Sequence, residues 1–350
     1  MKRLQLLDYG RFFAAFSVLA YHYTHKGIKA EKILSFELNE QVSAITKFGH
    51  FGVEFFFVIS GFVIYYSVKN RTPQQFAVAR LKRLFPTYWV AVLITALIGL
   101  LYNQPHIIEV NTAKVLANLT MLPGKFGYAN LDGVYWTLVY ELKFYLLVFV
   151  IMMLRGDKKI IYWFQLWAVY IVSTNISGLA MPFNSSYFLL FIAGAHFAQI
   201  RIQKSKVLIA SQVLLFLAIV YLKYISQSGN IIIYTAIIGG CFLFFVIQIQ
   251  PKVEQWKLPC SKILGALTYP VYLIHGGIGY LVLNDIGSIK NQWWLISFVT
   301  IGVISISWFI HLFVEQKASK IWYNLFTVVT EKPINAVYKV IANLKSKASS

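Results

Sequence analysis

The chain has 350 residues, of which 58% are hydrophobic, 17% aromatic and only 13% charged, and its mean hydropathy is +0.62. Because soluble globular domains carry about 25% charged residues, this composition excludes a soluble protein and indicates an integral membrane protein. The net charge of +19 would favour a nucleic-acid ligand in a soluble chain. In a membrane protein, Lys and Arg concentrated in alternate loops explain it, so no nucleic-acid partner is expected.

Ten apolar segments follow one another along the chain. Each is predicted to be a helix, because unpaired backbone groups cannot face lipid, although several are shorter than the about 20 residues that a straight span needs. We therefore expect an all-α integral membrane protein, a bundle of about ten transmembrane helices. The expected spans are 7–25, 51–68, 86–102, 135–154, 160–175, 187–200, 207–224, 231–249, 263–283 and 292–314.

The loops between these spans differ in their content of Lys and Arg. With the N-terminus inside, the inside segments hold 22 of the 32 Lys and Arg residues, and the outside loops hold 8. Basic residues accumulate in cytoplasmic loops, so both termini are predicted to be cytoplasmic. Residues 1–314 form the expected transmembrane domain. Residues 315–350 form a basic tail, either an amphipathic helix on the anionic inner leaflet or a solvated end.

The first expected span carries two ionisable side chains, Arg11 and His22. They are eleven positions apart, which is roughly 16 Å along a helix and nearly the same direction around it. An ionisable group inside a span costs at least about 2.5 kcal/mol, so two on one stripe indicate a polar interior or pathway. The alternative is that Arg11 extends to the lipid headgroups and His22 lies at the far interface.

Two carboxylates are expected near the depth of His22. The predicted orientation places Arg11 towards the cytoplasm and Glu54 near the outer end of the second span, level with His22, while Glu141 lies at a similar depth or somewhat deeper. A carboxylate bound to one imidazole nitrogen would let His22 remove a proton from a hydroxyl at the other nitrogen. Alternatively, both carboxylates are interfacial groups bonded to water or to a neighbour.

A pair of arginines lies at the cytoplasmic mouth of the third span, in RLKRLFPTYW (80–89). Arg80 and Arg83 are three positions apart and share one helical face, an arrangement that suits a phosphate because guanidinium groups bind oxyanions in a fork. The alternative is that they anchor the helix to lipid phosphates.

The ninth span contains LTYPVYLIHGGIGY (267–280). Here Pro270 frees a backbone carbonyl and is a candidate for a kink, and His275 is expected to be a packing histidine. No chemistry is assigned to Lys143, His196 or His311, and no metal-ligand spacing occurs in the sequence, so no metal site is expected.

Five of these pieces occur in the order found in one family. Over residues 5–315 the sequence resembles the acyltransferase 3 family of integral membrane O-acyltransferases. The resembling pieces are LDYGRFFAAFSVLAYH, FGVEFFFVISGFVI, RLKRLFPTYW, WTLVYELKFY and TYPVYLIH. The resemblance implies a multi-pass enzyme of the bacterial inner membrane. Such an enzyme takes an acyl group, usually acetyl, from cytoplasmic acyl-CoA and delivers it to a hydroxyl outside, often on a surface polysaccharide.

The resemblance also implies roles for the residues singled out above. Arg80 and Arg83 would bind the CoA phosphates, and Arg11 would hold the thioester or the pantetheine arm. His22, with Glu54 or Glu141, would be the base for the acceptor hydroxyl or the site of a transient acyl group.

The implied partners are acyl-CoA, a carbohydrate acceptor, the lipid bilayer and, for completing the acceptor step, a separate periplasmic transferase. No permanently bound cofactor is expected. One departure from the family pattern is QKASK after Glu315, where members often have a proline, which leaves the role of Glu315 open. The alternatives are a glycan or lipid transporter whose pathway the charges line, and a structural subunit of a membrane complex.

Overall fold

A computed structural model describes residues 3–226 and 229–348, with side chains to residue 337. Within these residues the secondary structure is helical and contains no strand, which confirms the all-α class. The helices in chain order are α1 (Gln5–Tyr21), α2 (Gly27–Lys29), α3 (Glu40–Thr46), α4 (Gly52–Lys69), α5 (Pro73–Tyr102), α6 (Thr112–Leu119), α7 (Trp136–Met153), α8 (Ile160–Ile176), α9 (Tyr187–Ile202), α10 (Lys206–Ile225), α11 (Ile231–Gln248), α12 (Ser261–Ile274), α13 (Gly276–Ile286), α14 (Gln292–Ile310) and α15 (Ser319–Ala348).

All ten segments expected to span the membrane contain helix. By length and composition, six helical runs of the described chain can cross a membrane, and the bent pair α12–α13 would make a seventh. Helix α9 is apolar but shorter. Large apolar side chains such as Leu101 (73% exposed) and Phe298 (69% exposed) lie on the outside of the bundle, as a lipid-facing surface requires. The protein is a multi-pass membrane protein, and the count of ten spans stays a prediction.

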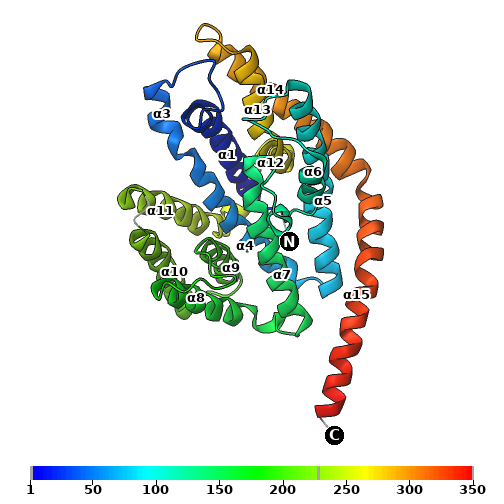
Figure 1. Cartoon of the computed structure of the whole chain (residues 1–350). Helices are drawn as coiled ribbons and strands as arrows, with labels where there is room; N and C mark the ends of the chain where they lie inside the picture. Colours follow the sequence, from blue (N-terminus) through cyan, green and yellow to red (C-terminus); the bar gives the residue numbers. More distant parts are fainter. Residues whose placement is uncertain (1–2, 227–228, 349–350) are drawn as a thin grey trace.

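Helix α4 runs through the middle of the bundle and packs closely against α9 (Figure 1). Two glycines make this approach possible. A Cβ atom on Gly61 would lie 1.8 Å from the carbonyl oxygen of Phe191, and one on Gly194 would lie 1.9 Å from that of Val58. Small residues let membrane helices bring their backbones together, and this pairing fixes α4, which carries Glu54, in the bundle.

The expected ninth span is broken, and the break is not at the proline. Pro270 lies inside α12, while α12 and α13 meet at His275 with a bend of 64°. The His275 Nδ1–H donates to the carbonyl oxygen of Tyr272 at 2.8 Å. The Asp132 carboxylate accepts the Gly277 N–H of α13 at 2.7 Å. Both helix ends at the bend therefore have side-chain partners, which satisfies backbone groups that the break would otherwise leave unpaired.

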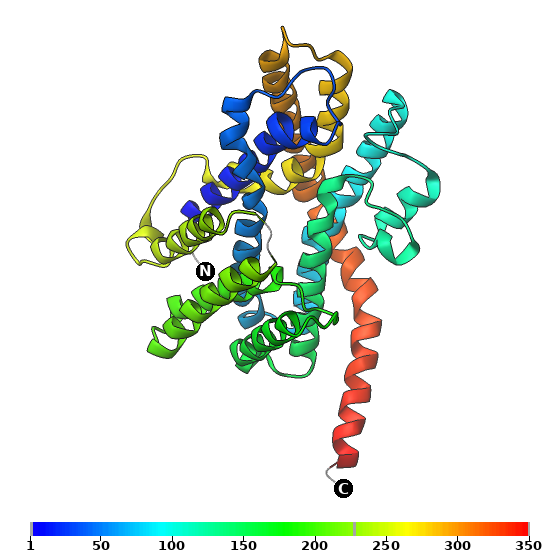
Figure 2. The ribbon, with the colours of Figure 1, turned by 60° about the vertical axis from the view of Figure 1, so that its left-hand side comes forward.

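The basic tail begins inside the bundle. A π-helical turn, His311–Lys317, joins α14 to α15, and the Trp322 indole N–H of α15 donates to the Val314 carbonyl at 3.0 Å. The rings of Trp322 and Phe326 pack near that of Trp89 on α5, with centroids 6.1 and 6.0 Å away. Beyond these turns α15 extends past the other helices (Figure 2). The start of α15 therefore belongs to the wall of the transmembrane domain.

Candidate active site

Four adjoining cavities form a series through the protein. An end pocket of about 650 Å³ meets a central cavity of about 230 Å³. The central cavity meets a His22 cavity of about 420 Å³, which in turn meets a His25 pocket of about 330 Å³. Each neighbouring pair shares two wall residues. The shared residues are, in that order, Arg80 and Arg83, Val53 and Tyr272, and Tyr21 and His50.

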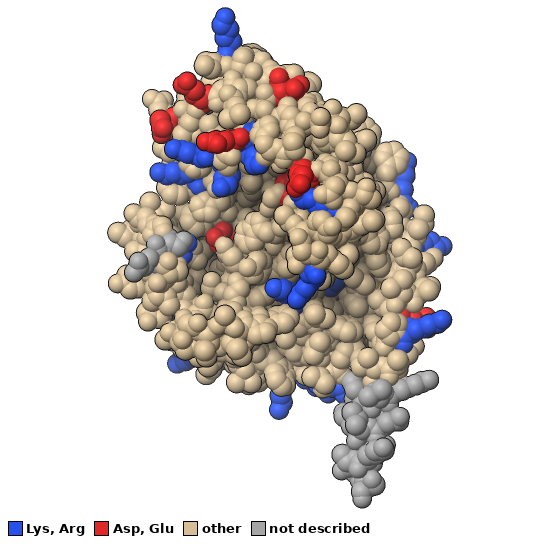
Figure 3. Space-filling model, viewed as in Figure 1, with Lys and Arg blue, Asp and Glu red and all other residues tan. Residues whose placement is uncertain are grey.

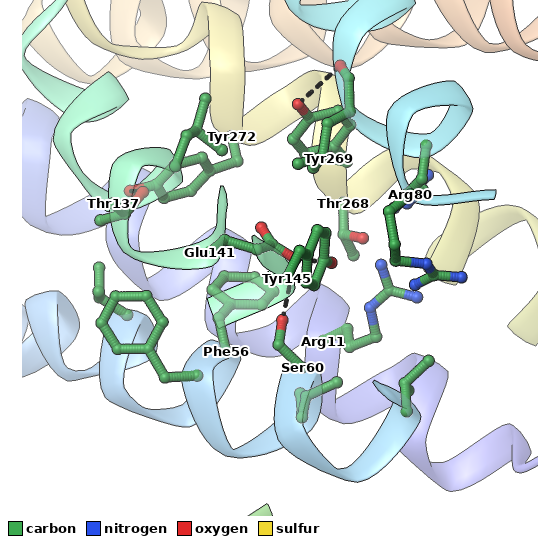
Figure 4. A pocket seen from close by; sticks show the side chains of 17 residues that line it. Arg11, Phe56, Ser60, Arg80, Thr137, Glu141, Tyr145, Thr268, Tyr269 and Tyr272 are labelled. Atoms are coloured by element: carbon green, nitrogen blue, oxygen red, sulfur yellow. Dashed lines mark hydrogen bonds between the residues drawn. The ribbon is translucent and has the colours of Figure 1, made fainter. Parts of the chain in front are cut away.

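The central cavity holds a carboxylate among arginines. Glu141 Oε1 accepts hydrogen bonds from the Tyr145 hydroxyl and from Ser60 Oγ at 3.1 Å. Tyr145 follows Glu141 by four positions on α7, so both side chains share one helical face. In Figure 4, Arg11 and Arg80 lie at one end of the cavity, with Glu141 and Tyr145 nearer its middle. The structure therefore places Glu141 in a cavity with Arg11 and not with His22, which agrees with the second of the two expected positions, deeper than His22.

Arg80 and Arg83 lie where the central cavity opens to the end pocket. The Arg80 guanidinium carbon is 5.6 Å from the centre of the Tyr145 ring, and its Nε is buried without a hydrogen-bond partner. The Arg83 guanidinium carbon lies 5.0 Å from the centre of the Tyr269 ring. As the three-residue spacing predicts, the two arginines line one opening, where an anion would meet both.

Glu315 links this opening to the last transmembrane segment. Its Oε1 lies 3.3 Å from Arg83 Nη1 and accepts the Thr87 hydroxyl at 2.9 Å. Its Oε2 lies 2.7 Å from His311 Nδ1. The sequence leaves the role of Glu315 open and indicates no chemistry for His311, whereas the structure connects Glu315 to both Arg83 and His311. The four-residue spacing of His311 and Glu315, which places them on one helical face, is the sequence pattern that indicates their contact.

The end pocket combines cations with aromatic rings. Arg71 and Lys82 line it together with Arg80 and Arg83, and so do Trp322 and Tyr323 from α15. The Lys82 ammonium lies 5.9 Å from the centre of the Tyr323 ring. This pocket can accept a ligand that has both phosphate groups and a flat ring system.

The His22 cavity contains the candidate base. His22 Nδ1 is hydrogen-bonded to the Tyr280 hydroxyl, and the His275 ring packs edge-on to the His22 ring with centroids 4.9 Å apart. Glu54 lines the same cavity, and its buried Oε2 has no hydrogen-bond partner. The structure thus brings His22 and Glu54 into one cavity, but the partner of Nδ1 is a tyrosine instead of the expected carboxylate. Nε2 remains for a substrate.

Asp132 holds the wall of this cavity in place. It lies in the loop before α7, outside the helices, and its Oδ1 also accepts the Val134 N–H at 3.1 Å. Burial raises the pKa of the Asp132 carboxyl to about 6, while the N–H groups of Gly277 and Val134 act in the opposite direction. Tyr23 adds a second brace, since its hydroxyl donates to the His275 carbonyl at 2.8 Å. These contacts fix the bend that carries Tyr280.

His196 and Lys143, to which the sequence assigns no chemistry, lie apart from this series. His196 is fully buried in α9, and neither it nor Lys143 lines any of the four cavities. In the described part of the chain, no three His, Cys, Asp or Glu side chains come together as a metal site.

The fold and these cavities define a multi-pass membrane protein with adjoining cavities, lined by charged side chains, between its helices. The model of the acyltransferase 3 family, described as an acyltransferase domain, matches residues 4–312. The chain belongs to this family.

Two curated relatives were found. "Exopolysaccharide production protein ExoZ" of Rhizobium meliloti (strain 1021) is 36% identical over 108 residues, 28% of this chain and 32% of that protein. "Putative acetyltransferase ORF330" of Acidianus two-tailed virus is 23% identical over 252 residues, 65% of this chain and 72% of that protein. The chain therefore spans about a third of ExoZ and under three quarters of ORF330 in these matches. No solved structure matches.

Proposed function

We propose that the protein moves an acetyl group from cytoplasmic acyl-CoA, bound at the end pocket, to a hydroxyl of a surface glycan in the His22 cavity. The observation that carries this proposal is the series of cavities, which has arginines at one end and an available imidazole at the other. The names of the two relatives, one an exopolysaccharide production protein and one a putative acetyltransferase, support the same proposal.

The donor fits the end pocket and the central cavity. Phosphate groups of CoA would bind Arg80 and Arg83, and the adenine ring would stack on Trp322 or Tyr323. The central cavity, which has a smaller volume than the end pocket, would bind the pantetheine arm. Arg11 would then lie beside the pantetheine arm. The salt bridge from Glu315 holds the Arg83 guanidinium where the end pocket meets the central cavity.

The transfer chemistry uses His22. In the tautomer whose Nδ1–H donates to the Tyr280 oxygen, Nε2 has a free lone pair. Nε2 takes the proton of the acceptor hydroxyl while that oxygen attacks the thioester carbonyl. The C–S bond breaks, CoA leaves as the thiolate, and the imidazolium returns the proton to it. A two-step route would place the acyl group on Nε2 first, and labelled protein after incubation with acyl-CoA alone would distinguish it from direct transfer.

The proposed membrane orientation follows from the Lys and Arg bias of the loops. It places the end pocket at the cytoplasmic face of a bacterial inner membrane and the His22 cavity at the outer face. A separate periplasmic transferase would complete delivery when the final acceptor lies beyond the reach of the membrane domain.

The test is acyl-CoA binding and turnover by purified protein. Arg80→Gln with Arg83→Gln should raise the Kd for acyl-CoA at least tenfold, and His22→Ala should abolish transfer while leaving that Kd unchanged. Arg155→Gln is the matched control, because this exposed arginine lines none of the four cavities. A protein that neither binds nor consumes acyl-CoA would contradict the proposal and favour a transporter.

A further inference from the structure

The His25 pocket is cationic and has no role in the transfer chemistry. It is lined by Tyr21, His25, Lys47, Phe48, His50, Phe51, Lys223, Gly229, Asn230, Ile233 and Tyr234. The basic side chains come from three places in the chain, namely the end of the first helix, the turn before α4 and the end of α10. None of the described residues that line the pocket is acidic.

The adjoining His22 cavity brings two more lysines near this pocket, and it also contains the carboxyl groups of Glu54 and Asp132. Lys26, one helical turn after His22, lines the cavity, and so does Lys32. Figure 3 shows Lys and Arg side chains beside α3 at a hollow in this face of the protein, with Asp and Glu side chains next to them. Because the His25 pocket shares Tyr21 and His50 with the His22 cavity, a group bound there would belong to a molecule that also reaches His22.

The acidic residues of segment 26–50 do not form ion pairs with Lys26 or Lys47 of the same segment. Acidic residues occur in the same loop, but in the described part of the chain no carboxylate lies within ion-pair distance of Lys26 or Lys47. Instead, the Lys47 ammonium lies 5.0 Å from the centre of the Phe48 ring. Loops on the outer face usually contain few Lys and Arg residues, whereas residues 26–50 contain four lysines. A ligand of opposite charge gives a physical reason for their presence.

The pocket also offers flat apolar surfaces. The His50 and Phe51 rings lie 4.0 Å apart between centroids, and the Lys223 ammonium lies 5.0 Å from the centre of the Tyr234 ring. Aromatic rings beside cations suit a sugar ring that carries an anionic substituent, since the ring face packs on the aromatic surface and the substituent meets the charge.

We infer that the acceptor glycan carries a negative charge, a carboxylate or a phosphate, which binds in the His25 pocket while the hydroxyl to be acylated lies at His22. This inference rests on the proposed function and names the class of its acceptor. The anionic group undergoes no chemistry. It positions the acceptor, and a neutral glycan is disfavoured because it lacks the attraction to the cations of the pocket.

Binding of matched oligosaccharides to the full-length purified protein tests the inference. The probes are an oligosaccharide containing glucuronic acid, the same oligosaccharide after reduction of its carboxyl groups, and a phosphorylated counterpart. The wild-type protein should bind at least one charged probe at least tenfold more tightly than the reduced one, and the preferred probe tells carboxylate from phosphate. Equal affinity for all three probes, or binding of none, would overturn the inference.

Variants locate the binding and separate it from the donor site. Lys47→Gln should weaken binding of the charged probe about tenfold and leave the Kd for acyl-CoA unchanged, whereas Lys125→Gln, on an exposed loop outside the four cavities, should change neither. If Lys47→Gln misfolds, raising the salt concentration should weaken binding of the charged probe to the wild-type protein and spare the reduced one. Charge-independent binding would overturn the inference while acyl-CoA turnover still upheld the proposed function.

Discussion

Replacing Tyr280 with phenylalanine tests how the base is positioned. The Tyr280 hydroxyl is hydrogen-bonded to His22 Nδ1 in the wall of the His22 cavity. The Tyr280 ring also packs near the His22 imidazole, with ring centroids 5.7 Å apart. Tyr280→Phe keeps this ring and removes only the hydroxyl. His22 then lacks the partner that holds its ring in place and accepts the Nδ1–H in the tautomer with a lone pair on Nε2.

The size of the effect follows from the lost hydrogen bond. Leaving a buried polar group without its partner costs about 1 to 3 kcal/mol. If that cost falls on the transition state, the rate drops by roughly 5-fold to 150-fold. Because the donor contacts lie in the central cavity and the end pocket, the KM for acyl-CoA should not change. We therefore expect a lower kcat at saturating acyl-CoA together with an unchanged donor KM.

Steady-state transfer kinetics in detergent or nanodiscs provide the measurement. Tyr23→Phe is the matched control, because its hydroxyl bonds to the His275 carbonyl and not to the His22 ring. It should lower thermal stability and leave kcat within about threefold. The reasoning is refuted if Tyr280→Phe keeps the wild-type kcat while His22→Ala abolishes transfer, since His22 would then act without its observed partner.

Three further predictions concern packing and positioning. Gly61→Leu should prevent folding or lower the melting temperature strongly, because its Cβ would meet the Phe191 carbonyl at 1.8 Å, whereas Gly240→Ala, with no atom within 4 Å, should be neutral by thermal size-exclusion chromatography. Glu315→Gln should raise the donor KM about threefold to tenfold with little change in kcat, because it weakens the hold on Arg83; a wild-type donor KM would show that the ion pair does not position the arginine. Asp132→Ala should lower stability by about 1 to 3 kcal/mol, measured by thermal unfolding, because it removes the partner of the Gly277 N–H of α13; unchanged unfolding would argue against this cap.

Helix periodicity alone was enough to predict part of the site. Arg80 and Arg83 line the same opening because residues three apart on a helix are neighbours on its surface. Arg11 and His22 line two different cavities along one helix direction, as an eleven-residue spacing implies. These predictions depend only on local geometry within one helix.

Contacts between helices were not predictable in the same way. The depth of Glu141 depends on the tilt of α7 and on where it begins, and a shift of one turn, about 5 Å, moves a side chain from one cavity to the next. The bend at His275 depends on Asp132, more than a hundred residues earlier in the chain. Tyr280 reaches His22 only because of that bend, so no local pattern indicated it.

The central claim is that one chain carries an acyl group from a donor on one side of the membrane to an acceptor on the other. Its most direct test uses the purified protein in sealed vesicles, with acetyl-labelled acetyl-CoA supplied only on the side of the end pocket and surface glycans of the source organism only on the other. We predict labelled glycan with the wild-type protein and none with His22→Ala. Unlabelled glycan with the wild-type protein, in vesicles where acetyl-CoA is bound, would contradict the claim.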